Sequence, residues 1–168
     1  MRVGEKYHTS SNRNDYNTPI EAWEVLIDNM EDTTVKFWLP FYNDGLIKKA
    51  LKKQLKLNVI HVNKDFFSYE PKSYDIIADN PSYFQKALVF KRCLQLDKPF
   101  ALLVPLETLE RKYFAQMFKD DDRLQMIVPK KRYEFESMYF DSTGKVPFKS
   151  VWMCWKMNLK SKNNMIFE

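Results

Sequence analysis

Residues 74–83 read Tyr-Asp-Ile-Ile-Ala-Asp-Asn-Pro-Ser-Tyr, which combines a short apolar run with a turn. After Asp75 the residues up to 78 are continuously apolar, as in a parallel strand that is covered on both faces. Asn80-Pro81 follows at once, and proline stiffens the backbone there because its ring fixes one dihedral angle. We therefore expect a buried strand over 74–78, with a rigid turn directly after it.

Strands and helices alternate on both sides of this turn. Apolar runs predict the strands, and apolar residues at helical spacing predict the helices between them. Such alternation implies an α/β protein with a mainly parallel sheet between two helical layers, in which ligands bind at the carboxyl ends of the strands. The predicted strands are 35–41, 58–62, 74–78, 100–104, 124–128 and 151–157, and the predicted helices are 18–30, 46–55, 83–96 and 109–118.

Composition narrows the class of protein. A length of 168 residues suits one domain, and a net charge of +5 favours a polyanionic partner such as nucleic acid. No apolar run approaches the roughly 20 residues that cross a membrane, and no Cys/His cluster indicates a metal. Cys93 and Cys154 lie in apolar stretches, so we expect reduced core residues of a cytoplasmic protein. His8, in the polar start, and His61, inside a predicted strand, are not expected to be catalytic.

The turn after the central strand has groups that can orient a weakly nucleophilic amine. The side-chain oxygen of Asn80 and the carbonyl of Pro81 can both accept hydrogen bonds from one NH2 group, which favours the pyramidal, attacking nitrogen. The amine of adenine needs such help, because its lone pair is delocalised into the ring. Tyr83 offers a ring on which an extruded base can stack. The same residues also suit an ordinary strand end, with Ser82 capping the next helix.

Several segments match one family pattern in order along the chain. Asn80-Pro81-Ser82-Tyr83 follows the form Asp/Asn/Ser-Pro-Pro-Tyr/Phe/Trp, and residues 37–45 follow a glycine-rich turn usually written Glu/Asp-Pro-Phe-x-Gly-x-Gly. Asp65-Phe66-Phe67 follows an acidic-aromatic pair, and residues 15–19 follow Tyr-x-Thr-Pro. Together with the strands at 98–105 and 150–155, these segments resemble the adenine-N6 DNA methyltransferases, especially the small single-domain type of phages and viruses.

The resemblance implies the Rossmann-like fold of S-adenosylmethionine-dependent methyltransferases for residues 15–159, between a flexible N-terminal segment, 1–14, and a C-terminal tail, 160–168. It implies transfer of a methyl group from S-adenosylmethionine to the N6 amine of adenine in nucleic acid, with DNA preferred over RNA. Residues 80–83 are then the catalytic turn. The residues implied to bind the cofactor are Tyr16, Thr18, Pro19, Phe41, Gly45, Asn63, Asp65 and Phe66.

Four positions depart from the family pattern and motivate one alternative, a catalytically silent subunit that binds nucleic acid or an active protein partner. A second alternative is a methyltransferase that acts on an amine in RNA or on a glutamine side chain, because the same turn suits these planar amines. At Asn43 the turn itself can survive, because asparagine can adopt a positive φ. The departures are Leu39 and Asn63, where acids are usual, Asn43, where the first turn glycine is usual, and Ser82 in place of the second proline.

A basic stretch follows the strand predicted at 124–128. Lys130-Lys131-Arg132 precedes Tyr133-Glu134-Phe135, and positive charge beside aromatic rings is what phosphate contacts and base stacking need. The connection up to residue 149 is long, and compact domains usually reserve such connections for function. We expect this stretch to bind nucleic acid, although a solvated loop is the alternative. Another lysine group is expected to be the solvated face of a helix and comprises Lys48, Lys49, Lys52, Lys53 and Lys56.

Overall fold

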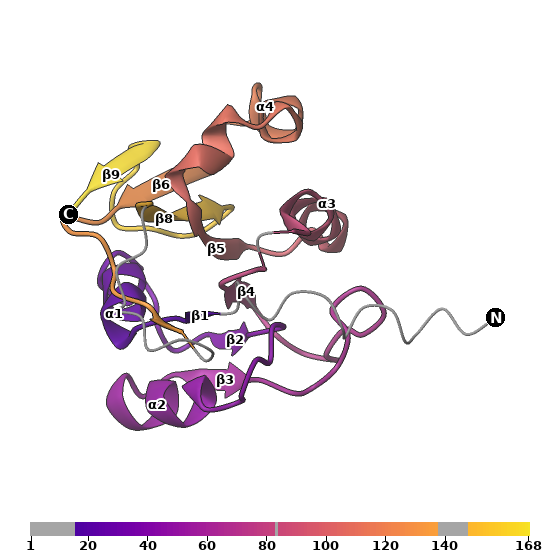
Figure 1. Ribbon diagram of the computed structural model, residues 1–168, viewed down its shortest axis with the longest axis vertical. Helices are drawn as coiled ribbons and strands as arrows, with labels where there is room; N and C mark the ends of the chain where they lie inside the picture. Colours follow the sequence, from indigo (N-terminus) through magenta and orange to yellow (C-terminus); the bar gives the residue numbers. More distant parts are fainter. Residues whose placement is uncertain (1–15, 83, 138–147) are drawn as a thin grey trace.

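A seven-stranded sheet forms the centre of the molecule, with helices on both of its faces (Figure 1). This computed structural model describes residues 16–82, 84–137 and 148–168. The predicted N-terminal segment, 1–14, and Tyr83 lie outside the described residues. The strand order is β3-β2-β4-β5-β8-β6-β9, with bounds β2 Lys36–Trp38, β3 Asn58–Ile60, β4 Ile76–Asp79, β5 Phe100–Pro105, β6 Leu124–Val128, β8 Ser150–Trp155 and β9 Met165–Phe167.

All strands of this sheet except β8 point the same way. The neighbours among β3, β2, β4 and β5 pair in parallel, and β9 pairs in parallel with β6. Because β8 is antiparallel to both β5 and β6, those two strands share one direction. Each strand predicted from the sequence is present, and the mainly parallel sheet is confirmed.

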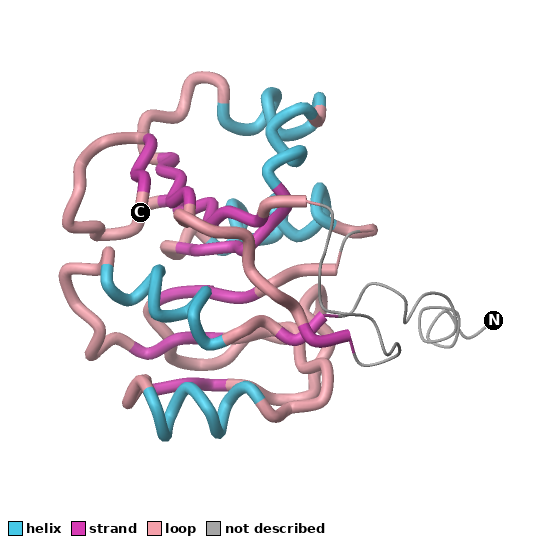
Figure 2. The backbone as a smooth tube through the Cα atoms, turned by 60° about the vertical axis from the view of Figure 1, so that its left-hand side comes forward, coloured by secondary structure: helices cyan, strands magenta, loops and turns pink. Residues whose placement is uncertain are grey.

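Helices α1 (Ile20–Asp28) and α2 (Ile47–Gln54) pack on one face of the sheet, and α3 (Lys86–Leu96) and α4 (Lys112–Phe118) pack on the other (Figures 1 and 2). The predicted three-layer architecture is therefore confirmed. The helix predicted over 109–118 is divided, since a 3-10 helix, Leu106–Glu110, precedes α4.

The central strands show why their sequences are continuously apolar. Every residue of β4, β5 and β8 is buried, because helices cover both faces of the sheet. Side chains alternate between the two cores, so that Ile77 lies in the core beneath α3 and Ala78 in the core beneath α1. Cys93 and Cys154 are buried and unpaired, which confirms their predicted place in the core.

Three short strands were not predicted from the sequence. β1 (Tyr16–Asn17) and β7 (Glu136–Ser137) form an antiparallel pair, which joins the chain before α1 to the chain after β6. β9 pairs with β6, so the sheet continues into the segment 160–168 that was predicted as a tail. Among the described residues, no helix is long and apolar enough to span a membrane.

Candidate functional site

The carboxyl ends of β2 and β4 lie where the chain reverses its progress across the sheet. From β2 it moves outward to β3, and it then returns past β2 to form β4. Beyond β2, the Leu39 N–H donates to Ile60 O of β3 at 2.9 Å, whereas Asp79 at the end of β4 is in register with Leu102 of β5. The two strands therefore separate here, which is the position where open α/β sheets bind ligands.

The turn after β2, residues 39–45, has the backbone geometry of a glycine-rich turn. Asn43 has a φ of 46° and Gly45 a φ of 75°, which confirms that asparagine supplies a left-handed residue at position 43. The Gly45 N–H donates to Tyr42 O at 2.8 Å, and Asp44 accepts the Leu46 N–H at 2.9 Å just before α2. The turn thus presents a compact loop of backbone at the carboxyl edge of the sheet.

Gly45→Ala is expected to destabilise the fold by on the order of 1–2 kcal/mol, because an L side chain is strained at positive φ. The new Cβ would also lie 2.5 Å from the Tyr42 ring, so the ring must shift. Chemical denaturation measures the loss. Asn43→Gly, at the other left-handed position of the turn, is the control and should change stability by less than about 0.5 kcal/mol. Equal stability of Gly45→Ala and the wild type would contradict the geometry.

A buried histidine directly after β3 supports this turn. The His61 Nδ1 lies 2.9 Å from Leu39 O, and because a carbonyl only accepts hydrogen bonds, Nδ1 is the donor. The His61 ring also stacks on Tyr42, with ring centroids 4.9 Å apart. These contacts give His61 a supporting place beneath the turn. The sequence predicted it inside a strand, whereas β3 ends at Ile60 and His61 directly follows it.

A buried acid, Asp79, supports the same turn from β4. Its side chain is 6% exposed, and its Oδ2 accepts the Phe41 N–H at 2.7 Å while its Oδ1 accepts the Asn80 N–H at 2.9 Å. Burial raises the pKa of Asp79 to about 8, and the two N–H groups offset part of that shift. Sequence reasoning missed this residue. The one feature of the sequence that could have identified it is an acid directly after an apolar, fully buried run.

The predicted catalytic turn follows β4 without interruption. Asn80 and Ser82 are half-buried and Pro81 is buried. Ser82 does not cap the following helix: α3 begins at Lys86, its N-cap residue is Gln85, and no side chain caps it. The alternative was that residues 80–83 only end a strand and cap the next helix. The strand does end here, but the cap is absent.

The residues expected to bind the cofactor lie in three segments that meet at the turn after β2. Phe66, in the loop after β3, is buried with its ring centroid 5.4 Å from that of Phe41. Asn17, next to Thr18 and Pro19, donates from Nδ2 to Asp44 at 3.0 Å, which ties β1 to the turn.

Other members of the set differ in how they present their side chains. Asn63 is exposed in the loop after β3. Asp65 is exposed, but its carboxylate accepts the Phe67 N–H at 3.2 Å and the Ser68 hydroxyl at 2.8 Å. It therefore stabilises its own turn. Only the backbone of Tyr16 is described, within β1.

The basic stretch lies apart from the catalytic turn. Lys130, Lys131 and Arg132 are exposed directly after β6. β6 ends at the same edge of the sheet as β4, but three strand positions away, or about 14 Å at ~4.8 Å per strand. Figure 1 shows the chain leaving β6 beside the C-terminus before it reaches β1.

The prediction that aromatic rings beside the basic stretch stack on bases is wrong. Tyr133 is 8% exposed and Phe135 is 2% exposed, and both belong to the core beneath α1. Their rings pack against the protein interior and are not available to stack on bases. Because the Lys130–Arg132 stretch still carries three exposed positive charges, only its expected contact with phosphates is retained.

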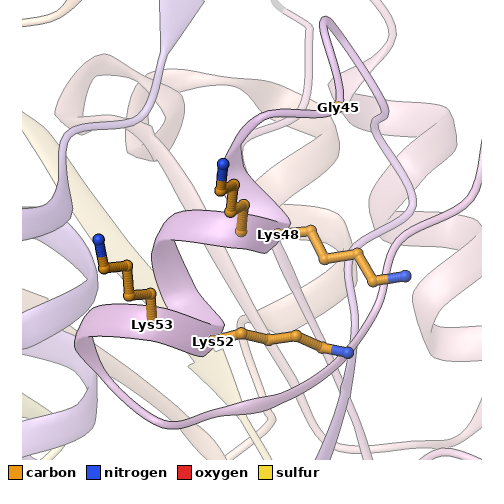
Figure 3. Close-up of a pocket in the computed structure, with 5 residues that line it drawn as sticks. Gly45, Lys48, Lys52 and Lys53 are labelled. Carbon is orange, nitrogen blue, oxygen red and sulfur yellow. The ribbon is translucent and has the colours of Figure 1, made fainter.

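A shallow groove of about 500 Å³ runs along α2 and is lined with lysines (Figure 3). Figure 3 shows Lys48 and Lys52 extending to one side of the helix and Lys53 to another, as residues four apart share a face. The groove extends from Gly45, in the turn after β2, along the lysines of α2. Within the described residues, no three His, Cys, Asp or Glu side chains are grouped to hold a metal ion.

Comparisons with known proteins establish the fold. No protein-family model matches the chain, and no curated protein sequence matches it. Among solved structures it is similar to the 23S rRNA methyltransferase ErmE, with a TM-score of 0.52 and 12% identity over 88% of this chain and 73% of that chain. It is also similar to precorrin-6y C5,15-methyltransferase from Geobacter metallireducens GS-15, with a TM-score of 0.43 and 14% identity over 84% of this chain and 94% of that chain. The first likeness and the strand order confirm the Rossmann-like methyltransferase fold.

Proposed function

We propose that the chain is an S-adenosylmethionine-dependent methyltransferase that methylates the N6 amine of adenine in DNA. One observation carries the proposal. Asn80-Pro81 follows the buried strand β4 directly, and Asp79 joins this turn to the turn after β2 at the switch point of the sheet. The family resemblance assigns the target amine to the first turn and the cofactor to the second.

The residues at the ends of β2 and β3 fit the cofactor. The left-handed backbone at Asn43 and Gly45 keeps the turn compact, and the exposed amide of Asn63 can hydrogen-bond a ribose hydroxyl. Asp65 keeps acceptor capacity beyond its two described hydrogen bonds, because a carboxylate offers about four lone-pair positions. Bound S-adenosylmethionine supplies a methyl group on a positively charged sulfur, and Phe41, Gly45 and Asn63 are the residues proposed to hold it.

Asn80 and Pro81 are proposed to orient the amine. The side-chain oxygen of Asn80 and the carbonyl of Pro81 accept hydrogen bonds from its two N–H groups, so the nitrogen becomes pyramidal and its lone pair is no longer delocalised into the ring. Pro81 is buried and restricts the backbone, which keeps the two acceptors at a constant separation. Tyr83 is proposed to stack on the base. No strong general base is needed, because the amine loses its proton readily once it carries the methyl group.

The test is incubation with labelled S-adenosylmethionine and a panel of DNA, RNA and protein substrates. Label at the N6 position of adenine in DNA supports the proposal. Label in protein alone, or in no substrate at all, contradicts it. A calorimetric titration with S-adenosylmethionine separates the silent subunit from an enzyme whose substrate is missing from the panel, since no binding at millimolar ligand favours the silent subunit.

A second candidate is methylation of the same amine in RNA. The likeness to a 23S rRNA methyltransferase favours it, and the exposed basic stretch after β6 suits either nucleic acid. The two-acceptor turn also suits adenine in either polymer. Matched single-stranded DNA and RNA oligonucleotides of one base sequence distinguish the two candidates, because only the 2′-hydroxyl differs along their backbones.

Asn63→Asp is expected to tighten S-adenosylmethionine binding about five-fold, because a charged acceptor holds a ribose hydroxyl roughly 1 kcal/mol more strongly than a neutral one. Calorimetry measures the change. Asn163→Asp adds the same charge to an exposed loop before β9 and should leave the affinity unchanged. If Asn63→Asp binds the cofactor no better than the wild type, Asn63 does not contact the ribose.

A further inference from the structure

The two turns of the candidate site are connected by one buried side chain. Backbone pairing between β2 and β4 ends at Trp38 and Ile77, and beyond these residues each strand follows its outer neighbour. Asp79 lies two residues past the end of this ladder. Its carboxyl group reaches the Phe41 N–H across the separation and takes the Asn80 N–H on its other oxygen.

We propose that Asp79 is a positioning residue that holds the turn after β2 and the turn after β4 in one fixed arrangement. This inference rests on the proposed function, which assigns the cofactor to the first turn and the target amine to the second. The carboxyl group sets the distance between them through two short hydrogen bonds to backbone, one on each oxygen. It touches neither reactant and acts through Phe41 and Asn80.

The chemistry of the side chain supports this role. Once it is ionised, the carboxyl group of Asp79 has two oxygens that only accept, so above its pKa it can bind an N–H group from each turn at once. Asparagine offers one acceptor oxygen and an NH2 group that cannot accept, and leucine offers neither. A buried carboxyl group is costly, since burial raises the pKa of Asp79 to about 8 even though the two backbone N–H groups lower it. An apolar residue would fill the core at lower cost but would leave the Phe41 N–H without its acceptor.

The proposed reaction requires the two turns to keep a fixed arrangement. Methyl transfer requires the amine and the methyl group to meet in a narrow range of positions, and a displacement of about 1 Å can cost on the order of 100-fold in rate. The turns that are assigned to the two reactants belong to strands that separate at this edge. A rigid connection across the separation therefore preserves their alignment.

Asp75→Asn provides a matched control for Asp79→Asn. Asp75 accepts the Lys36 N–H on Oδ2 at 2.7 Å, so it bridges the same two strands with the same chemistry. It lies at the opposite end of β4, away from both turns, and it is exposed. A purely structural contribution should therefore appear in both variants, whereas a positioning role should appear only in Asp79→Asn.

The connection itself is tested by NMR on the protein without ligand. The pKa of Asp79 is raised by burial, and no charged side chain among the described residues contributes to the shift. The carboxyl group should lose its proton near pH 8, above the ordinary value of about 3.9. The amide proton shifts of Phe41 and Asn80 should follow that one titration in the wild type and in Asp75→Asn, and should lose it in Asp79→Asn. Independent behaviour of the two amides in the wild type would overturn the proposal.

The positioning role is tested by binding and turnover. Asp79→Asn should bind S-adenosylhomocysteine about tenfold more weakly, because the turn after β2 loses a hydrogen bond that holds it in place, and turn over at least about tenfold more slowly. Its turnover should no longer change with pH around 8, whereas Asp75→Asn should match the wild type. Wild-type binding, turnover and pH profile in Asp79→Asn would overturn the proposal. If the wild type itself binds no cofactor, the proposed function fails, and the NMR titration still decides whether Asp79 connects the turns.

Discussion

Replacing Asn80 by alanine is expected to reduce methyl transfer to nucleic acid by roughly 100-fold or more, as for the loss of one preorganised hydrogen bond to a transition state. The amide oxygen is one of the two proposed acceptors of the target amine, and alanine leaves only the carbonyl of Pro81. Cofactor binding should stay close to the wild type, because Asn80 follows β4 rather than β2 or β3. Turnover and calorimetry with S-adenosylhomocysteine measure the two quantities separately.

Asn80→Asp is the control for this prediction. Aspartate keeps an acceptor oxygen in nearly the same place, and the family motif accepts it at this position. Its turnover should therefore lie well above that of Asn80→Ala, while thermal unfolding shows whether either variant is damaged. Wild-type turnover in Asn80→Ala would remove the turn after β4 from the mechanism and favour its reading as an ordinary strand end.

Changing Lys130, Lys131 and Arg132 to alanine is expected to weaken nucleic-acid binding for every sequence alike, because phosphate contacts carry no base information. The slope of log affinity against log salt should become shallower by up to about two to three units, since each contact releases counterions from a duplex. All three side chains are exposed and lie about three strand spacings from the catalytic turn. Cofactor affinity should not change. Binding measured at several salt concentrations provides the slope.

The lysines of α2 provide a control with the same loss of charge. Lys48, Lys52 and Lys53 line the groove in Figure 3, on the outer side of a helix that we expect to be solvated. Changing these three to alanine should leave the salt slope unchanged. A shallower slope in the α2 variant, with a wild-type slope in the Lys130–Arg132 variant, would place the phosphate contacts on α2 and make the stretch after β6 a solvated loop.

The sequence alone was sufficient for the architecture, because the signals that specify it are local. A run such as Ile76–Ile77–Ala78 is apolar at every position, and such a run indicates a strand covered on both faces wherever it occurs. The positive φ of Asn43 was also predictable, since it depends on the conformations open to one residue and its immediate neighbours. The position of Asn80-Pro81 at the end of β4 follows from the same local pattern.

Only the tertiary structure decided which distant residues meet. Asp79 and Phe41 are 38 positions apart, and no local pattern links an acid on β4 to a backbone N–H after β2. Because Tyr133 and Phe135 follow a basic stretch, the sequence suggests that they are exposed beside it. They are buried, because the chain after β6 crosses the core beneath α1. β1, β7 and β9 are each two or three residues long, with no longer apolar run around them to predict a strand, and they exist because another strand lies beside them. Contacts of this kind depend on how the layers pack, and that packing cannot be predicted from the residues next to each position in the sequence.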